Sequence, residues 1–411
     1  MQYPLVALFT TILNSLLFGG NTSTSLDVAP KTVVLDGSKL LDARTKLVNN
    51  KADADLQAAF KHLKSQANHL LDKGPWSVTD KKVHGPGAGI HDYTSQAPYY
   101  WSSKPDGGCP YVVRDGKRNP EARKYTDHSE RAYMFNSSYT LSLAWYYTGD
   151  EKYARKAADV LRNWFILKDK RMNPNLDHAQ FIPCQNTGSS GGIIDWSEGY
   201  TTVLDAVAIL ESTKAPGWTD HDVTVFKKWN TDFLHWLDNS DFGKKESAAT
   251  NNHGIFALQL RAGIALFLGK ASQAKRIAEG AKQRVNKYIS PSGAQPQELS
   301  RTRSFHYSAF TLVAYTRLAM IATHRGLKVD LWRYKGPKGQ SIQKAVEYLI
   351  PAATKEKKWN HKELDFTPSE ANGVIHWAAD VGNAKAKKAV GRVPAPPSGD
   401  LWPVHPAPDA F

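Results

Sequence analysis

Residues 132–165 read AYMFNSSYTLSLAWYYTGDEKYARKAADVLRNWF, and residues 252–288 read NHGIFALQLRAGIALFLGKASQAKRIAEGAKQRVNKY. Each stretch predicts a helix, a short turn that contains Gly149 or Gly269, and a second helix. The glycine supplies the left-handed residue that ends the first helix, and the polar residue after it can begin the next one. Because so short a connection makes the two helices antiparallel neighbours, each stretch predicts a helical hairpin.

The rest of the chain contains further helical segments and almost no strand signal. Counting the two hairpins, the sequence predicts about ten helices, the others being near residues 53–73, 199–213, 219–238, 303–325, 341–350 and 369–390, whereas residues 31–50 show no strong period. Repeated antiparallel helix pairs are typical of a solenoid or of an (α/α) toroid, and no fixed short repeat supports the solenoid. We therefore predict an all-α fold, an incomplete (α/α) toroid over residues 26–393, with long aromatic loops over a cleft.

The charge balance favours a polyanionic partner. The 411 residues include 53 basic and 39 acidic side chains, a formal net charge of +14 that is spread along the chain. Such a protein attracts polyanions, which could be nucleic acid or acidic polysaccharide. No nucleic-acid-binding motif is visible, so acidic polysaccharide is the expected partner, with no nucleic acid, no membrane and no cofactor. We expect a monomer.

The two ends of the chain differ from its middle. Residues 1–25 contain an apolar run that is too short for a membrane span, and they predict a signal peptide and secretion. Glycosylation sequons at Asn21 and Asn136 agree with export. Residues 394–411 contain six prolines and predict an irregular C-terminal strap.

Cysteine usage predicts one disulfide and no metal centre. Cys109 and Cys184 are the two cysteines of the chain, and they do not form a CxxC motif. In an oxidising compartment they could form a disulfide that joins two long loops, and the alternative is two separate buried thiols. No HExxH motif or carboxylate-histidine cluster at ligand spacing occurs, so we predict that no metal is bound.

Two helix starts carry polar groups that a simple helix does not need. Asn252 and His253 follow Asn251 before an apolar helix; either asparagine could be a helix cap, but capping does not explain all three residues. Arg301, Arg303, His306 and Tyr307 lie together at the start of another helix, where cations oppose the helix dipole. This arrangement indicates that an anion is held there, although we expect Glu298 to pair with one arginine.

Residues 74–126 form a long stretch without helical period, which is usually functional in a compact domain. Its aromatic residues, together with Asp and Gln, are what sugar rings use for stacking and hydrogen bonding, although loop packing explains some of them.

Five stretches resemble the alginate-lyase type of polysaccharide lyases, a family with enzymes acting on alginate and on glucuronan. They are HDYTSQAPYYW (91–101), PYVVRDGKRNPE (110–121), RMNPNLDHAQFIPCQNTG (171–188), AATNNHG (248–254) and QPQELSRTRSFHYS (295–308). The resemblance implies an α/α toroid and a catalytic set formed by Asn252, His253, Tyr307 and Arg301, with Arg303 as a rival to Arg301. The expected substrate contacts are His91, Tyr93, Gln96, Tyr99, Trp101, Arg114, His178, Gln180, Asn186 and His306.

The chemistry of β-elimination suits these residue types independently. The reaction removes the proton on C5, next to a carboxylate, and expels the oxygen on C4, so fixed donors such as Asn252 and His253 must neutralise the carboxylate. A cation beside Tyr307 should lower the pKa of its phenol toward that of a usable base. In β-linked glucuronate and mannuronate both reacting groups lie on one face, so Tyr307 could serve as base and acid. For guluronate, whose groups lie on opposite faces, His253 could be the base.

Two other functions stay open on the sequence alone. A glycoside hydrolase on the same toroid would need two carboxylates flanking the bond, and Asp92, Asp195 and Glu198 are the candidates. A non-catalytic polysaccharide-binding protein would keep the cleft without the chemistry.

Overall fold

Four buried helices form the centre of the molecule. The computed structural model describes residues 26–185, 187–323 and 326–404. The inner helices are α3 (Asp127–Thr148), α6 (Tyr200–Ser212), α9 (Asn252–Phe267) and α12 (Ser304–Thr323), and each contacts the next. Nearly every residue of α6, α9 and α12 is buried, as is typical of helices that are apolar on all sides.

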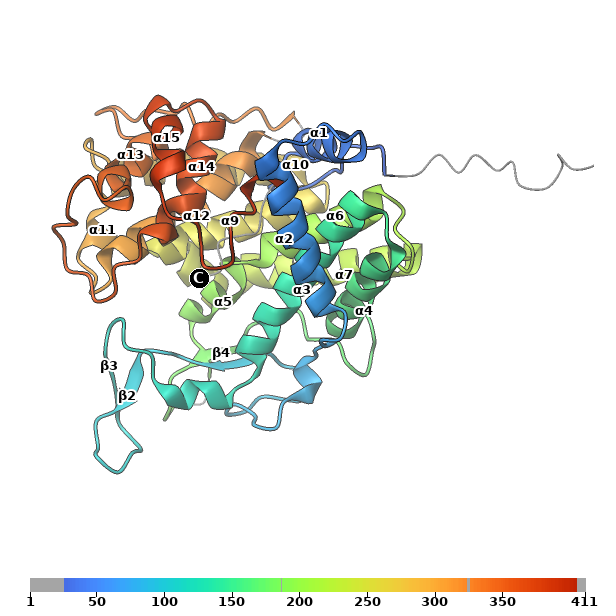
Figure 1. Ribbon diagram of the computed structural model, residues 1–411. Coiled ribbons are helices and arrows are strands. Elements are labelled where there is room, and N and C mark those ends of the chain that lie inside the picture. Colours follow the sequence, from blue (N-terminus) through green and yellow to red (C-terminus); the bar gives the residue numbers. More distant parts are fainter. Residues whose placement is uncertain (1–25, 186, 324–325, 405–411) are drawn as a thin grey trace, which may run out of the picture.

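A second set of helices packs around the inner row. These are α4 (Glu151–Phe165), α7 (Asp220–Asn239), α10 (Ala271–Tyr288) and α13 (Ile342–Ala353). The two predicted hairpins are confirmed as α3–α4 and α9–α10, whose turns contain Gly149 (φ 70°) and Gly269 (φ 74°) in the left-handed region. The inner and outer helices together form the expected incomplete (α/α) toroid (Figure 1).

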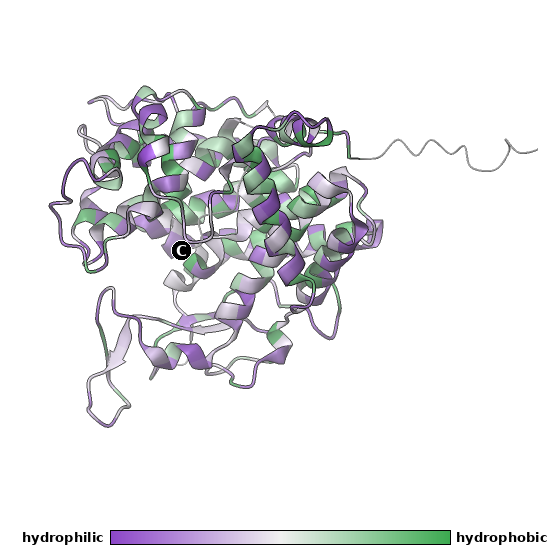
Figure 2. Ribbon diagram, in the orientation of Figure 1, coloured by the Kyte–Doolittle hydropathy of each residue, from purple (hydrophilic) through white to green (hydrophobic). Residues whose placement is uncertain are grey.

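The described chain contains seven further α-helices. They are α1 (Gly37–Val48), α2 (Ala54–Leu70), α5 (Ile194–Ser197), α8 (Asp241–Ala248), α11 (Pro296–Leu299), α14 (Asn372–Asp380) and α15 (Ala384–Ala389). The surface helix α2 carries hydrophobic and hydrophilic residues along its length (Figure 2). No helix in the described ranges is both long and apolar enough to cross a bilayer.

Two predictions of helices were wrong in part. Helix α1 lies in residues 31–50, where we found no strong period; Asp36 caps it, accepting from the backbone nitrogen of Ser38 at 2.9 Å. Few residues of α1 are buried, so the sequence has few apolar positions from which a helical period could be recognised. The predicted helix at 369–390 is two helices, because Gly382 lies between them with φ 100°.

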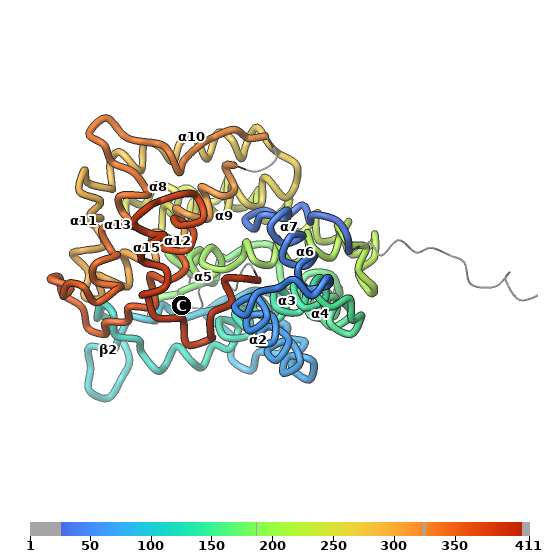
Figure 3. Tube along the Cα trace, turned by 45° about the horizontal axis from the view of Figure 1, so that its top comes forward, coloured from blue at the N-terminus to red at the C-terminus, as the bar shows by residue number. Residues whose placement is uncertain are grey.

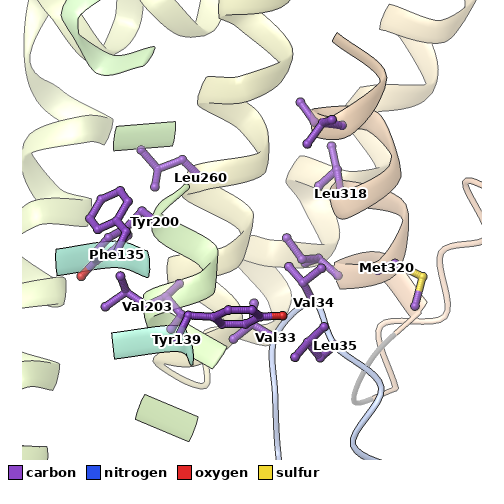
Figure 4. Close-up of a cluster of buried hydrophobic side chains, with 14 of the residues drawn as sticks. Val33, Val34, Leu35, Phe135, Tyr139, Tyr200, Val203, Leu260, Leu318 and Met320 are labelled. Carbon is purple, nitrogen blue, oxygen red and sulfur yellow. The ribbon is translucent and has the colours of Figure 1, made fainter. Parts of the chain in front are cut away.

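The N-terminal segment fills one end of the toroid. The backbone N–H groups of Val33, Val34 and Leu35 all donate to the carboxylate of Asp205 on α6. Figure 4 shows these three residues among the buried side chains of the inner helices, beside Tyr139. Burial raises the pKa of Asp205 to about 6, although the backbone hydrogen bonds oppose the shift.

The long loops contain four short β-strands, which pair with one another, whereas the sequence predicted almost no strands. Strand β1 (Thr94–Gln96) pairs in parallel with β4 (His178–Phe181), and β2 (Tyr100–Ser102) pairs in antiparallel with β3 (Tyr111–Val113). The predicted disulfide is present: Cys109 and Cys184 are bonded, with Cα atoms 6.0 Å apart. The β2–β3 hairpin projects from the helical body (Figure 1).

The strap lies across α2 and α14. Trp402 stacks on His376 with ring centroids 4.8 Å apart, and the hydroxyl of Tyr147 donates to the carbonyl of Val404 at 2.9 Å. Figure 3 shows the strap, in red, beside α2, in blue. The predicted signal peptide, the sequon at Asn21, Asn186 and residues 405–411 lie outside the described residues.

Candidate active site

The described chain contains a cleft of about 1070 Å³ at the N-terminal ends of three inner helices, α3, α9 and α12. His128 lies in the first turn of α3, Asn252 and His253 begin α9, and His306 and Tyr307 lie in the first turn of α12; all of them line the cleft. Because the N-terminus of a helix carries partial positive charge, this arrangement favours an anionic ligand. The predicted Asn-His and Arg-Tyr segments therefore meet in one site.

Glu298 holds Asn252. The backbone nitrogen of Asn252 donates to Glu298 Oε1 at 2.7 Å, and its side-chain Nδ2 donates to Oε2 at 2.9 Å. Both side chains are buried, with exposed fractions of 1% and 2%. The expectation that Glu298 pairs with an arginine was wrong, because its two oxygens bind the start of α9. Within the described residues, Glu298 is the acceptor for Nδ2, so its second hydrogen is left for a ligand.

Glu246 holds His253. Its Oε1 lies 2.5 Å from His253 Nδ1, and its side chain is 4% exposed. Burial alone would lower the pKa of His253, but the charge and hydrogen bond of Glu246 outweigh burial, so the pKa is raised above its ordinary value. The ring is therefore held toward its protonated form, with Nε2 as the nitrogen available to the cleft.

Arg301 lies between Tyr307 and the β2–β3 hairpin. Its guanidinium carbon is 3.7 Å from the centroid of the Tyr307 ring. Its Nη2 donates to Asp115 Oδ1 at 2.5 Å, and Asp115 also accepts from the backbone nitrogen of Thr302 at 3.1 Å. Burial would raise the pKa of Asp115, but the hydrogen bonds from Arg301 and Thr302 lower it to about 2. Asp115 thus ties the hairpin to the start of α12.

Tyr307 is paired with a second tyrosine. Its hydroxyl lies 2.7 Å from the hydroxyl of Tyr99, which comes from the aromatic loop. Burial and the neighbouring Tyr99 raise the pKa of Tyr307, and the opposing charge of Arg301 does not compensate. The expectation of a lowered pKa was wrong for the free protein, because burial of the phenol outweighs the charge of Arg301. Tyr307 is therefore a phenol at neutral pH.

Arg303 and His306 share one carboxylate. Arg303 Nη2 lies 3.4 Å from Glu370 Oε1, and His306 Nδ1 lies 2.9 Å from the same oxygen. Both residues line the cleft, but among the described arginines it is Arg301 whose guanidinium lies over the Tyr307 ring. This contact favours Arg301 over Arg303 as the arginine of the reacting group.

The buried carboxylate of Asp195 lines the cleft and holds three other side chains by hydrogen bonds. Asp195 accepts from Tyr93, Ser95 and, at 2.6 Å, the Nε2 of Gln180, a residue held at φ 43°. The carboxylates proposed for a hydrolase are similarly engaged: Glu198 binds Arg131 at 2.7 Å, and Asp92 accepts from Asn173 at 2.7 Å. None of the three is presented as a free acid or base, so the geometry does not favour hydrolysis.

The structure separates the predicted substrate contacts into two groups. Tyr99, Gln180 and His306 line the cleft. His91, Tyr93, Trp101, Arg114 and His178 are not among its lining residues, and Gln96 lines a neighbouring chamber. Tyr93 is buried at 1% exposure, and Arg114 lies over the Trp101 ring, 5.1 Å from its centroid, on the hairpin.

Three residues hold other side chains of the site in roles that the sequence did not reveal: Glu246, Asp115 and Glu370. His128, which lines the cleft, was also not predicted. Asp115 stands within a stretch of the family resemblance, which was the available signal. Glu246 gives none, because a helix break lies between it and His253. In the described ranges, no group of three His, Cys, Asp or Glu residues is placed to hold a metal ion.

Comparison with known proteins assigns the family. The sequence profile of the family described as alginate lyase matches residues 77–359. The chain belongs to the alginate lyase family. It is accordingly a polysaccharide lyase. A search of curated proteins finds no match.

Solved structures agree with this assignment. A crystal structure of an alginate lyase from Bacteroides ovatus is 30% identical, with a TM-score of 0.84 over 91% of this chain and 98% of that one. Alginate lyase A1-III from Sphingomonas species A1 is 16% identical, with a TM-score of 0.58 over 95% of this chain and 100% of that one. At this lower identity, the second likeness concerns the fold alone.

Proposed function

We propose that this member of the alginate lyase family is a secreted enzyme that cleaves β-1,4-linked polyuronates by metal-independent syn β-elimination. The substrates would be mannuronate-type alginate or glucuronan, and the products would carry 4,5-unsaturated uronate ends. The observation that carries the proposal is one cleft in which Tyr307, Arg301, His253 and Asn252 all present polar groups. The relatives named above are alginate lyases, which supports an acidic polysaccharide as the substrate.

The first requirement of the reaction is to stabilise negative charge on the substrate carboxylate. Removal of the C5 proton pushes electrons into the adjacent carboxylate, so donors fixed in advance lower the barrier. A protonated His253 and the free hydrogen of Asn252 Nδ2 are such donors, since Glu246 and Glu298 hold them in place. The positive charge of Arg301 adds to this field.

The second requirement is proton transfer on one face of the sugar ring. Tyr307, in its phenolate form, takes the C5 proton; the C4–C5 double bond forms as the bond from C4 to the glycosidic oxygen breaks. The same tyrosine then returns its proton to that oxygen and is again a phenolate. The raised pKa of Tyr307 makes the phenolate scarce but strongly basic, and Tyr99 can donate a hydrogen bond to it.

His253 is less suited to be the base. A base must be unprotonated, whereas Glu246 raises the pKa of His253 and favours the protonated ring. The geometry therefore supports His253 as a donor to the carboxylate, and it supports substrates whose C5 hydrogen and C4 oxygen lie on one face.

A substrate panel tests the proposal. The protein is incubated with glucuronan, polymannuronate and polyguluronate in the presence of EDTA, while the absorbance of unsaturated uronate is recorded. Rising absorbance with glucuronan or polymannuronate is the expected result. New reducing ends without absorbance would indicate a hydrolase, and binding without either signal would indicate a non-catalytic protein.

Secretion is proposed on separate grounds. The apolar leader in residues 1–25, the sequon at Asn136 and the disulfide between Cys109 and Cys184 support it. Asn136 is exposed on α3, so a glycan could be accommodated there. The test is N-terminal sequencing and glycosidase treatment of protein collected from the medium of the producing cells; a retained Met1 in intracellular protein would contradict export.

A further inference from the structure

A second chamber opens beside the cleft. Its volume is about 430 Å³, and it shares Pro98, Arg118 and His128 with the lining of the cleft. The shared residues make the two spaces neighbours, so a chain bound in the cleft can continue into the chamber. The other lining residues are Ser95, Gln96, Asn119, Pro120, Ala122, Arg123, Tyr125 and Ser129.

The chamber is lined by basic side chains and by no acidic ones. Arg118 and Arg123 both line it, and neither makes an ion pair with a described residue. The arginines of the cleft differ, since Arg301 binds Asp115 and Arg303 binds Glu370. An arginine without a protein carboxylate, at the wall of a cavity, is suited to a carboxylate on a ligand.

A buried amide in the chamber also lacks a partner. Gln96 is 5% exposed, and within the described chain its Nε2 has no hydrogen-bond acceptor. A buried donor without an acceptor is costly, so its retention in a cavity points to an acceptor on a ligand. Tyr125 and the prolines 98 and 120 supply apolar surface for a sugar ring. The Tyr125 ring is fixed against Phe181, with centroids 4.8 Å apart.

We propose that this chamber is an additional subsite, which binds a uronate residue of the polysaccharide at a distance from the bond that is cleaved. Arg118 and Arg123 bind its carboxylate, and Gln96 donates to an oxygen of the ring or of a hydroxyl. The volume lies within the range of about 300 to 1,000 Å³ that is usual for ligand sites. The identity of the ligand as a polyuronate rests on the proposed function.

The test compares two neighbouring charges. Arg123→Gln removes a charge that lines the chamber, whereas Lys124→Gln removes a charge from the next residue, which lines neither the chamber nor the cleft. Both variants are made in the full chain on a Tyr307→Phe background, which prevents turnover. Binding of mannuronate oligomers of two to about eight sugars is measured by calorimetry.

We expect Arg123→Gln to weaken the binding of the longer oligomers by about 3- to 30-fold, as befits a partly exposed charge-assisted hydrogen bond. Binding of the dimer should not change. The Lys124→Gln variant should bind all oligomers with an affinity within about twofold of that of the parent protein, because a single exposed surface charge usually contributes little. An equal loss in both variants, or no loss in Arg123→Gln, would overturn the subsite.

The outcome is separable from that of the proposed function. If the unmodified protein cleaves polyuronate and Arg123→Gln binds and cleaves all lengths normally, the lyase stands and the subsite falls. If the unmodified protein cleaves nothing but long oligomers bind through Arg123, the subsite stands and the lyase falls.

Discussion

At the scale of single residues, the charge of His253 is set by a carboxylate that lies seven positions earlier. Glu246 is buried and contacts His253 Nδ1 at 2.5 Å, which leaves Nε2 as a donor toward the cleft. Tyr307 is held in its neutral form, since burial raises the pKa of its phenol. The reactive combination, a protonated His253 with an ionised Tyr307, is therefore a minor form whose amount depends on pH.

The pH profile of kcat/KM should reflect this combination. Below the pKa of His253 the imidazole stays protonated while the phenolate increases, so kcat/KM should rise about tenfold per pH unit. Above that pKa the loss of imidazolium offsets the gain of phenolate, and the profile should level. The levelling point should lie above the ordinary histidine pKa of about 6.5, because Glu246 raises the pKa of His253.

Glu246→Gln provides the check on this assignment. The variant loses the negative charge that favours imidazolium, so its levelling point should move to lower pH and its plateau should be lower. An unchanged levelling point would show that another group titrates there. Circular dichroism spectra of both proteins control for misfolding at this buried position.

Tyr307→Phe should abolish turnover and leave binding largely intact. The substitution removes the hydroxyl that takes the C5 proton and returns it to the leaving oxygen, and loss of such a group costs about 10² to 10⁴ in rate. Tyr99→Phe is the matched control: it removes the partner hydroxyl but not the base, so a smaller loss, of about tenfold, is expected. Near-normal kcat in Tyr307→Phe would remove Tyr307 from the mechanism.

At the scale of elements, the helices were predictable and the contacts between loops were not. Gly149 and Gly269 mark the two hairpins, because a left-handed turn is a local property of the chain. The pairing of Asp115 with Arg301 joins residues 186 positions apart. This pair forms only if the β2–β3 hairpin packs beside the start of α12, and no local sequence pattern predicts that packing.

This pair leads to a prediction about the hairpin. Asp115→Asn should loosen it from α12, because the charged hydrogen bonds to Arg301 are lost, and kcat/KM should fall by about 10- to 100-fold. Limited proteolysis should cut the hairpin faster. Asp106→Asn, at an exposed position near the tip of the same hairpin, is the control and should behave like the unmodified protein.

The pH dependence of this contact follows from the lowered pKa of Asp115. A carboxyl group with a lowered pKa in the folded state stabilises the contact above its ordinary pKa, and it loses that contribution as pH falls through the folded value. Since that value is about 2, the hairpin should resist proteolysis at pH 4 as it does at pH 7. Release of the hairpin near pH 4 would contradict the pairing.

At the scale of the whole molecule, the motifs located the site more accurately than they assigned individual contacts. Asn252, His253, Arg301 and Tyr307 meet because α9 and α12 both begin at the cleft. Tyr93 lies in an equally suggestive motif but points into the protein, where it donates to Asp195. The sequence around an aromatic loop residue does not show whether its side chain faces a ligand or the core, so such assignments need a structure.

The net charge of the molecule leads to the last prediction. A formal charge of +14, with the N-termini of α3, α9 and α12 at the cleft, should attract a long polyanion from beyond the contact distance. Raising NaCl from about 0.02 M to about 0.5 M shortens the screening length from roughly 20 Å to roughly 4 Å. We expect KM for a long polyuronate to rise by about tenfold with little change in kcat, because screening weakens approach and binding but not the proton transfers. A trimer, which carries few charges, should show a much smaller rise. If the trimer and the polymer respond by the same factor, or if kcat carries the effect, local contacts in the cleft rather than the field of the whole protein govern capture of the substrate.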